Sequence, residues 1–553
     1  FFCESGTLGA TFLEEMAARQ LGLSTFISPG MRVDVSSNDL LQYWETDDST
    51  SVVLLYLQGL GNPRKFARIV RRLSRRKPVL AVLTGRVHAE ASDDGQVLPD
   101  NVVDELLGQC GVLQTRTIGG LLDVAALLAM QPIPRGPRVA LVSNSTALLM
   151  HTMDLVDSSG MHTVQRPYRV TWDADGDAVG GILRQALEAT DVDAVIVIHV
   201  PPVRSDLSGV TEVLRDVAAN STKPLLAVLP HETGLTGRSS LVVNPSAQGA
   251  PGPGSVPVYG EPAAAVAALA LAVQHAQWLA TPVGEEPEPL GIDEERAERV
   301  IDNRLGPALP PVDSGNETAP LHIVRPGGRH ELGQHETIEL FASYGLELWP
   351  SFPVESEAEA AERAAEIGYP VVLKTASSKL VHRTDLGGVR LSLENERALR
   401  TAFLSMVAQH PADVREQLLI QAMAPPGVTC AVVTREDRAF GPVMALSVGG
   451  FVSDLVEDWA YWMPPLTDVD AQTLIRTPRT SELLFGYQGS ELANVNALAA
   501  VLMRVARMAE DWPQIQRLEI NPMLVTPTGC YLLGASVQLV PADERQEMQP
   551  RRM

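Results

Sequence analysis

Short, largely apolar runs recur along the first half of the chain, and helical segments alternate with them. The runs lie at 51–57, 78–83, 139–142, 194–200 and 225–229. They are the length of strands and too short for buried helices. Strands buried on both faces and alternating with helices form parallel sheets. The pattern therefore predicts an α/β protein with flavodoxin-like, doubly wound parallel sheets.

With 553 residues, the chain is too long for a single core. We predict a first flavodoxin-type domain at 1–128 and a second at 129–282. A stretch rich in Pro, Glu, Gly, Asp and Ser then predicts a linker at 283–325, with a short helix at 293–303. A third α/β domain is expected at 326–553. In it, 517–520 and 523–525 are predicted as separate strands.

The charge balance excludes some partners. A net charge of −23 repels nucleic acid and anionic membranes. The apolar run 263–280 contains Gln274, His275 and Gln277, which favours a buried helix over a membrane span. Four scattered cysteines show neither metal-site nor disulfide spacing, so we expect a cytoplasmic protein. The chain begins with Phe1, in the middle of an apparent strand, and we expect that it is truncated at the N-terminus.

One lysine in the third domain closes an apolar strand. The chain has only 5 lysines against 39 arginines, so Lys374 stands out at the end of 371–374. A point charge there suits the phosphates of a nucleotide, and a Gly-Gly turn can approach them through its backbone N–H groups. We expect ATP or ADP to contact a set of residues in this domain: Lys374, His382, Asp385, Gly387, Gly388 and Gln421. The alternative is that Lys374 is a strand-end lysine whose head reaches solvent.

Two polar residues alternate on a strand far downstream. Glu519 and Asn521 are two apart, so both side chains face the same side of a strand. Carboxylate and amide oxygens bind Mg²⁺. We predict a weak magnesium site at this pair.

Two turns from a strand into a helix have similar composition. They contain Ser5, Gly6 and Thr7 in the first domain and Asn144, Ser145 and Thr146 in the second. A helix N-terminus offers unpaired N–H groups and partial positive charge, so such turns can hold a phosphoryl group. The alternative is that each serine is only an N-cap.

Taken in this order, these motifs resemble the nucleoside-diphosphate-forming acyl-CoA synthetases, the superfamily of succinyl-CoA synthetase. The resemblance implies two succinyl-CoA synthetase-like domains followed by an ATP-grasp domain. It also implies ADP-forming synthesis of acyl-CoA from an acid, CoA and ATP through an acyl phosphate and a phosphohistidine. Segments 61–66 and 76–79 are most similar to the bacterial branch fused to a GNAT acetyltransferase. CoA-binding and acetyltransferase domains would then lie upstream, and a homo-oligomer is possible.

The chain departs from that family at several places, and two of them concern the phosphohistidine and the metal. The Ser-His-Thr-Gly segment of the phosphohistidine is absent from 85–97, where His88 is the only histidine and a poor match in position. Gly534 stands where the family has an Asp that shares Mg²⁺ with Asn521. Two hypotheses stay open at this point. The chain is either an ADP-forming acyl-CoA ligase or a degenerate body that regulates an attached acetyltransferase.

Overall fold

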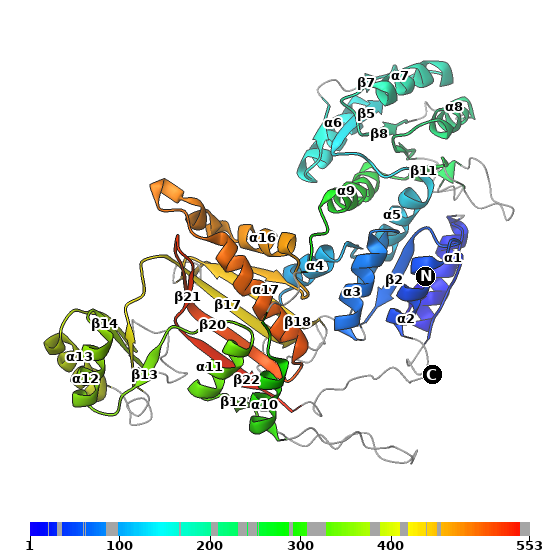
Figure 1. Cartoon of the computed structure of the whole chain (residues 1–553). Helices are drawn as coiled ribbons and strands as arrows, with labels where there is room; N and C mark the ends of the chain where they lie inside the picture. Colours follow the sequence, from blue (N-terminus) through cyan, green and yellow to red (C-terminus); the bar gives the residue numbers. More distant parts are fainter. Residues whose placement is uncertain are drawn as a thin grey trace, which may run out of the picture. The chain divides into compact units, whose positions relative to one another are not determined.

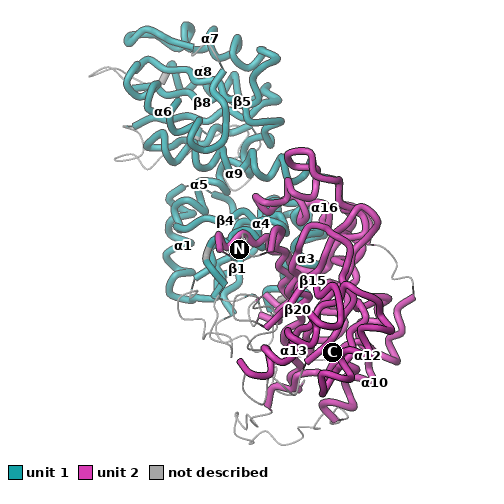
Figure 2. Tube along the Cα trace, turned by 90° about the vertical axis from the view of Figure 1, so that its left-hand side faces the viewer, with its two compact units in different colours: residues 1–282, 548–553 teal, residues 283–547 magenta. Residues whose placement is uncertain are grey.

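The computed structural model forms two compact units, Phe1–Pro282 and Val283–Glu547, coloured separately in Figure 2. Figure 1 shows the elements within each unit. The structure describes the chain outside a set of segments: 20, 30–35, 59, 61, 85–97, 165–167, 201–207, 231–239, 242–251, 253, 287–290, 307–327, 376–387, 410–417, 438–439, 451–454 and 542–553.

The first unit begins with a parallel sheet of order β1-β2-β3-β4. Its strands are β1 (Phe2–Cys3), β2 (Val53–Leu57), β3 (Val79–Leu83) and β4 (Val112–Gln114). Its helices are α1 (Gly6–Ala18), α2 (Ser37–Thr46), α3 (Pro63–Ser74), α4 (Asp100–Gln109) and α5 (Ile118–Met130). Every residue of β2 is buried, as expected for a strand covered on both faces.

A second sheet in the same unit has the order β10-β11-β9-β8-β5-β6, with β7 beside β5, and is parallel except for β10. Its strands are β5 (Arg138–Ser143), β6 (His162–Thr163), β7 (Tyr168–Arg169), β8 (Ala194–Ile198), β9 (Leu225–Val228), β10 (Ser240–Leu241) and β11 (Val256–Tyr259). Its helices are α6 (Thr146–Ser158), α7 (Gly176–Glu188), α8 (Ser208–Ala219) and α9 (Pro262–Ala280). Two parallel α/β sheets are therefore confirmed.

The two sheets share a hydrophobic core. One buried cluster contains Leu54 of β2, Leu121 of α5, Ile196 of β8 and Leu269 of α9. Among the described residues, α9 is the one helix long and apolar enough to cross a membrane. Most of its buried residues lie in this core, which is how the core helix of an α/β unit packs. The shared core holds both sheets in one compact unit.

The second unit contains a large antiparallel sheet of order β12-β22-β20-β17-β18-β19, with β21 beside β20. Its strands are β12 (His330–Glu331), β17 (Val428–Asp437), β18 (Gly441–Val448), β19 (Trp459–Trp462), β20 (Ile515–Val525), β21 (Cys530–Leu532) and β22 (Ala535–Leu539). Its helices are α10 (Glu294–Leu305), α11 (Gln334–Ser343), α16 (Asp468–Arg476), α17 (Val495–Asp511) and the 3₁₀ turns η2 (Arg479–Phe485) and η3 (Tyr487–Gly489).

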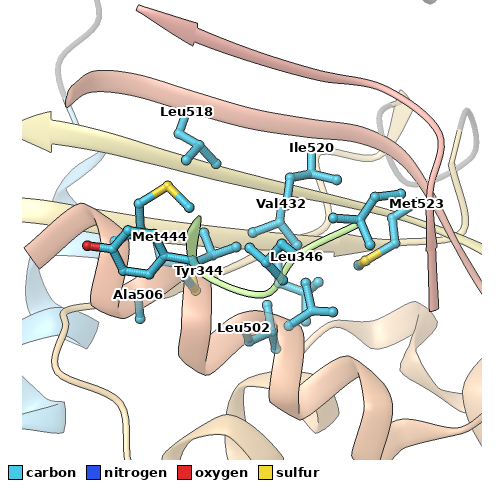
Figure 3. Packing of buried hydrophobic residues seen from close by; sticks show 14 of the residues in the cluster. Tyr344, Leu346, Val432, Met444, Leu502, Ala506, Leu518, Ile520 and Met523 are labelled. Carbon is cyan, nitrogen blue, oxygen red and sulfur yellow. The ribbon is translucent and has the colours of Figure 1, made fainter. Parts of the chain in front are cut away.

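Helices and strands of this large sheet meet in one core. Figure 3 shows Leu502 and Ala506 of α17 beside Val432, Leu518 and Ile520 of the strands. All five side chains are buried. Because successive strand residues alternate between faces, this packing leaves the other face of β20 to its polar residues.

A smaller antiparallel sheet of order β13-β16-β14-β15 completes the second unit. Its strands are β13 (Ser351–Pro353), β14 (Val371–Thr375), β15 (Val389–Leu393) and β16 (Leu418–Ala422), and its helices are α12 (Glu357–Ile367) and α13 (Glu396–Gln409). Ser356 caps α12, and Gly368 ends it with a positive φ of 91°.

Two segments differ from expectation. The strands predicted at 517–520 and 523–525 are one strand, β20. A register shift places Asn521 and Pro522 opposite the single residue between Cys430 and Val432, and such a bulge accepts a proline that lacks an N–H. The helix predicted at 293–303 is present as α10, but it does not behave as part of a linker, because its Val300 and Ile301 are buried in the core of the second unit.

One ion pair ties two strands of the second sheet together. Asp193 is 5% exposed and accepts from Arg138 at Nε, Nη2 and the backbone N–H, over 2.8–3.1 Å. The hydrogen bonds from Arg138 lower the pKa of Asp193. The contribution of the Asp193 carboxylate to the stability of the folded state is therefore fully present above pH 3.8, the ordinary pKa of an aspartate. That stabilisation is lost as the pH falls through the lower pKa of Asp193 in the folded state.

We predict that Asp193→Ala lowers the free energy of unfolding at pH 7 by about 2 kcal/mol, discounted because Arg138 is partly exposed. Asp216→Ala is the matched control, because the Arg184–Asp216 pair is exposed on both sides. We expect Asp216→Ala to lower the free energy of unfolding by less than about 0.5 kcal/mol. Urea denaturation measures both, and equal losses would contradict the prediction.

Candidate functional site

Lys374 joins the two sheets of the second unit. It lies on β14, and its Nζ donates to Oε1 of Gln421 at 3.0 Å and to the carbonyl oxygen of Leu533 at 2.6 Å. Leu533 lies between β21 and β22 of the large sheet. Desolvation by burial lowers the pKa of Lys374 from 10.5 to about 8. The ammonium thus lies in a poorly hydrated place, with no carboxylate among its described hydrogen-bond partners.

Gln421 lies beside Lys374 on the neighbouring strand β16. Its Nε2 donates to the carbonyl oxygens of Trp349 at 2.9 Å and Leu533 at 3.3 Å. The indole of Trp349 donates to Ala422 at 3.0 Å, and its backbone N–H donates to Leu532 at 2.8 Å. Lys374, Gln421 and Trp349 therefore form one hydrogen-bonded group where the small sheet meets the large one.

The polar face of β20 begins next to this group. The backbone N–H of Asn521 donates to Gly534 at 3.0 Å, and that of Leu533 donates to Pro522 at 3.0 Å. The side chains of Glu519 and Asn521 point to the same side, as the alternation predicts, and Asn521 Nδ2 donates to Glu519 Oε1 at 3.2 Å. Arg517 also lies on this face and pairs with Glu519 Oε2 at 2.9 Å.

The residues on this face fit a magnesium ion only in part. Mg²⁺ is usually held by one or two carboxylates together with substrate phosphates. Glu519 and Asn521 offer one carboxylate and one amide oxygen, and Arg517 competes for that carboxylate. Among the described residues, no group of three His, Cys, Asp or Glu side chains could hold a metal. The phosphates of a nucleotide would have to supply most of the ligands.

Several predicted residues lie outside the described part of the chain. They are His88 of the first unit and His382, Asp385 and Gly387 of the second. Gly388 is described: it is buried, and its carbonyl accepts from the N–H of Thr375, the last residue of β14, at 3.0 Å. The structure therefore brings together Lys374, Gln421, Glu519 and Asn521 from the predicted set, and places Gly388 beside the end of the Lys374 strand.

The two strand-to-helix turns of the first unit are built alike. Ser5 caps α1 with φ −113° and ψ 113°, and Ser145 caps α6 with φ −121° and ψ 112°. In each turn, the side chain of the residue two places before the cap donates to the backbone carbonyl of the cap residue. Cys3 Sγ donates to Ser5 and Ser143 Oγ donates to Ser145, both at 3.2 Å. Gly6, Thr7 and Thr146 are exposed at the first turns, which carry no acidic residue.

Asn144 has a structural partner. Its Nδ2 donates to the carbonyl of Val200 at 2.7 Å, and its Oδ1 accepts from the Val200 N–H at 2.9 Å. The amide nitrogen and the amide oxygen of Asn144 are therefore both bonded to the backbone of the segment that follows β8. Ser145 is the N-cap of α6, and its hydroxyl oxygen accepts from the Leu148 N–H at 3.4 Å.

A cavity of about 770 Å³ lies elsewhere, at the start of β5, β8 and β9. Arg138, Asp193 and Lys223 line it. Arg138 is bonded to Asp193, and Lys223 donates to the carbonyl of Ala189 beyond the end of α7 at 2.5 Å. Arg138, Asp193 and Lys223 thus hold helix and strand ends, so we place the candidate site at Lys374 instead.

Sequence reasoning missed three members of the Lys374 site. The carbonyl of Leu533 carries no sequence signal, because any residue has one. Trp349 is an isolated aromatic between α11 and β13. Arg517 could have been found, because it lies two residues before Glu519 and the same strand alternation puts both on one face.

Two families match the chain. The family described as a succinyl-CoA ligase like flavodoxin domain matches residues 1–128, and the ATP-grasp domain family matches residues 324–539. The 4-hydroxybutyrate–CoA ligase [ADP-forming] of Nitrosopumilus maritimus is 25% identical over 97% of this chain and 77% of its own length.

Two relatives match a shorter share of the chain at higher identity. The beta subunit of acetate–CoA ligase [ADP-forming] I of Pyrococcus furiosus is 31% identical over 38% of this chain and 91% of its own length. The dinucleotide-forming acetyl-coenzyme A synthetase 1 of Ca. Korarchaeum cryptofilum, solved with coenzyme A and Ca-AMPCP, is 31% identical over 38% of this chain and 93% of that chain, with a TM-score of 0.36.

The depressed pKa of Lys374 predicts a pH-dependent stability change. Below pH 8 the folded chain carries the full cost of the buried charge, and the cost disappears as the pH rises from about 8 to 10.5. We predict that Lys374→Met raises the free energy of unfolding at pH 7 by up to about 3 kcal/mol, less the lost hydrogen bonds. The gain should shrink by pH 10. Urea denaturation at both pH values tests this, and a pH-independent difference would contradict it.

Proposed function

The chain belongs to the ADP-forming acyl-CoA synthetase family, and from that premise we propose that it joins a carboxylic acid to coenzyme A while ATP becomes ADP and phosphate. Relatives of this kind use ATP or ADP and CoA, and the Korarchaeum structure contains coenzyme A with a nucleotide analogue. The regulatory alternative gains no support, because the relatives named above are ligases or synthetases. We also propose that the chain belongs to the branch fused to a GNAT acetyltransferase, on the basis of the amino-acid sequences at 61–66 and 76–79.

The observation that carries this proposal is the environment of Lys374. A desolvated ammonium whose described partners are a neutral amide and a carbonyl has unused capacity to attract an anion. Triphosphate oxygens are such an anion, and the electrostatic gain is greatest where water is excluded. Lys374 would hold the transferring phosphate of ATP and offset the charge that develops on it.

The remaining predicted residues take supporting roles in this proposal. Glu519 and Asn521 would contribute ligands to a magnesium ion, which would supply positive charge that offsets the charge of the phosphates. The first turns of α1 and α6, with Gly6, Thr7 and Thr146 exposed, would hold a phosphoryl group through backbone N–H groups. We propose short carboxylic acids as substrates, with acetate and 4-hydroxybutyrate as the first to assay.

Lys374→Met tests the nucleotide site. Losing a charge-assisted contact to phosphate should weaken ATP and ADP binding about tenfold or more. Lys77→Met is the matched control, because Lys77 Nζ also donates to two backbone carbonyls, of Trp44 and Asp47, in the first unit. Calorimetry measures affinity, and chromatography measures ADP and acyl-CoA formed by the full chain from acid, CoA and ATP. Equal affinity of wild type and Lys374→Met would remove Lys374 from the site.

Gly534→Asp tests the metal. The carbonyl of Gly534 accepts from the Asn521 N–H, so an Asp at 534 adds a carboxylate beside Asn521. We predict that Mg²⁺ changes the ATP affinity of the wild type only slightly and that of Gly534→Asp by about tenfold. Gly529→Asp, in the turn between β20 and β21, is the charge-matched control. Titrations with Mg²⁺ and with EDTA decide the matter, and strong dependence in the wild type would show that the metal site is placed wrongly.

A further inference from the structure

The orientation of the Gln421 amide is fixed by its partners. The ammonium of Lys374 can only donate, so the atom facing it at 3.0 Å is the amide oxygen. The carbonyl oxygens of Trp349 and Leu533 can only accept, so the atom facing them at 2.9 and 3.3 Å is the amide nitrogen. Every described partner agrees with one orientation of the side chain.

Gln421 has little left to offer a ligand. It is 3% exposed, both of its amide hydrogens have acceptors, and its oxygen already faces Lys374. A nucleotide contact would require one of these bonds to break and would leave a buried polar group unpaired, which is costly. Lys374, in contrast, has three donors and two described partners, so it can bind a phosphate oxygen without breaking either bond.

We propose that Gln421 is a positioning residue that holds the Lys374 ammonium in place for phosphate, and that it is not itself a nucleotide ligand. The inference rests on the proposed function, because it takes Lys374 as the phosphate-binding group. Trp349 fixes Gln421 in turn: its carbonyl accepts from the Gln421 amide, and its indole is bonded to Ala422, the next residue of β16.

The carbonyl of Leu533 has a related role in this arrangement. It accepts from both Lys374 and Gln421, at 2.6 and 3.3 Å, and so occupies a direction in which the ammonium can donate. The ammonium has three donors and two described partners, so a phosphate oxygen takes the remaining direction when the nucleotide binds. Lys374 therefore gains a partner while Gln421 and Leu533 keep it oriented, so little side-chain freedom is lost on binding.

A double-mutant cycle tests the proposal. ADP affinity is measured by calorimetry for the wild-type full chain, Gln421→Met, Lys374→Met and the double variant. We expect Gln421→Met to weaken ADP binding about fivefold and Lys374→Met about tenfold. In the double variant we expect no loss beyond that of Lys374→Met, because a residue that acts through Lys374 has nothing to act on once Lys374 is gone.

Gln131→Met is the matched control for a structural role. Gln131 is a buried glutamine that also bridges backbone groups, donating to Ser255 at 2.6 Å and accepting from Leu225 at 2.9 Å. We expect it to lower the melting temperature as Gln421→Met does, with ADP affinity unchanged. If Gln421→Met does not fold, Gln421→Ala replaces it in the cycle, because the smaller side chain leaves room for water.

The outcomes separate this inference from the proposed function. Unchanged ADP affinity in Lys374→Met overturns the nucleotide site itself. A loss in Lys374→Met with additive losses in the double variant makes Gln421 a direct ligand and overturns the positioning role. No loss in Gln421→Met, or an equal loss in Gln131→Met, overturns it as well.

Discussion

The positive charge of Lys374 lies where little water can reach it, and the arrangement around it follows from that constraint. A buried ammonium is expensive unless acceptors surround it. Here a side-chain amide and a backbone carbonyl provide them, the first from the small sheet and the second from the large one. The two sheets of the second unit are therefore joined at the point where the charge is held.

The strand β20 lies next to the Lys374 group, and its two faces carry different residues. Leu518 and Ile520 fill the core under α17, whereas Arg517, Glu519 and Asn521 line the opposite face. The bulge at Asn521 and Pro522 lets one strand run on past a proline. It also brings Asn521 against the segment of Leu533 and Gly534, which carries the carbonyl bonded to Lys374.

In the first unit, the same serine-capped turn follows a parallel strand in each of the two sheets. In both sheets the first strand runs into a helix through a serine cap, braced by a side chain two residues earlier. Parallel strands with crossover helices put helix N-termini at the carboxyl edge of a sheet. The prediction that these turns bind an anion rests on this topology and on the exposed small residues of the first helical turns. The side chain of Asn144, which was part of that prediction, instead bonds to the backbone of Val200.

The sequence alone determined the class of fold and the most informative residues. Apolar runs of strand length predict parallel sheets, because such strands must be covered on both faces. A lysine at the end of one of these strands, in a chain with few lysines, indicated a charge with a functional role. Strand alternation likewise put Glu519 and Asn521 on one face. What the tertiary structure decided is which groups meet. The carbonyl of Leu533, the indole of Trp349 and the amide of Gln421 come from segments far apart in the chain. Backbone carbonyls look the same in every sequence, so only folding could show that the carbonyl of Leu533 faces Lys374 and that Trp349 holds the Gln421 strand.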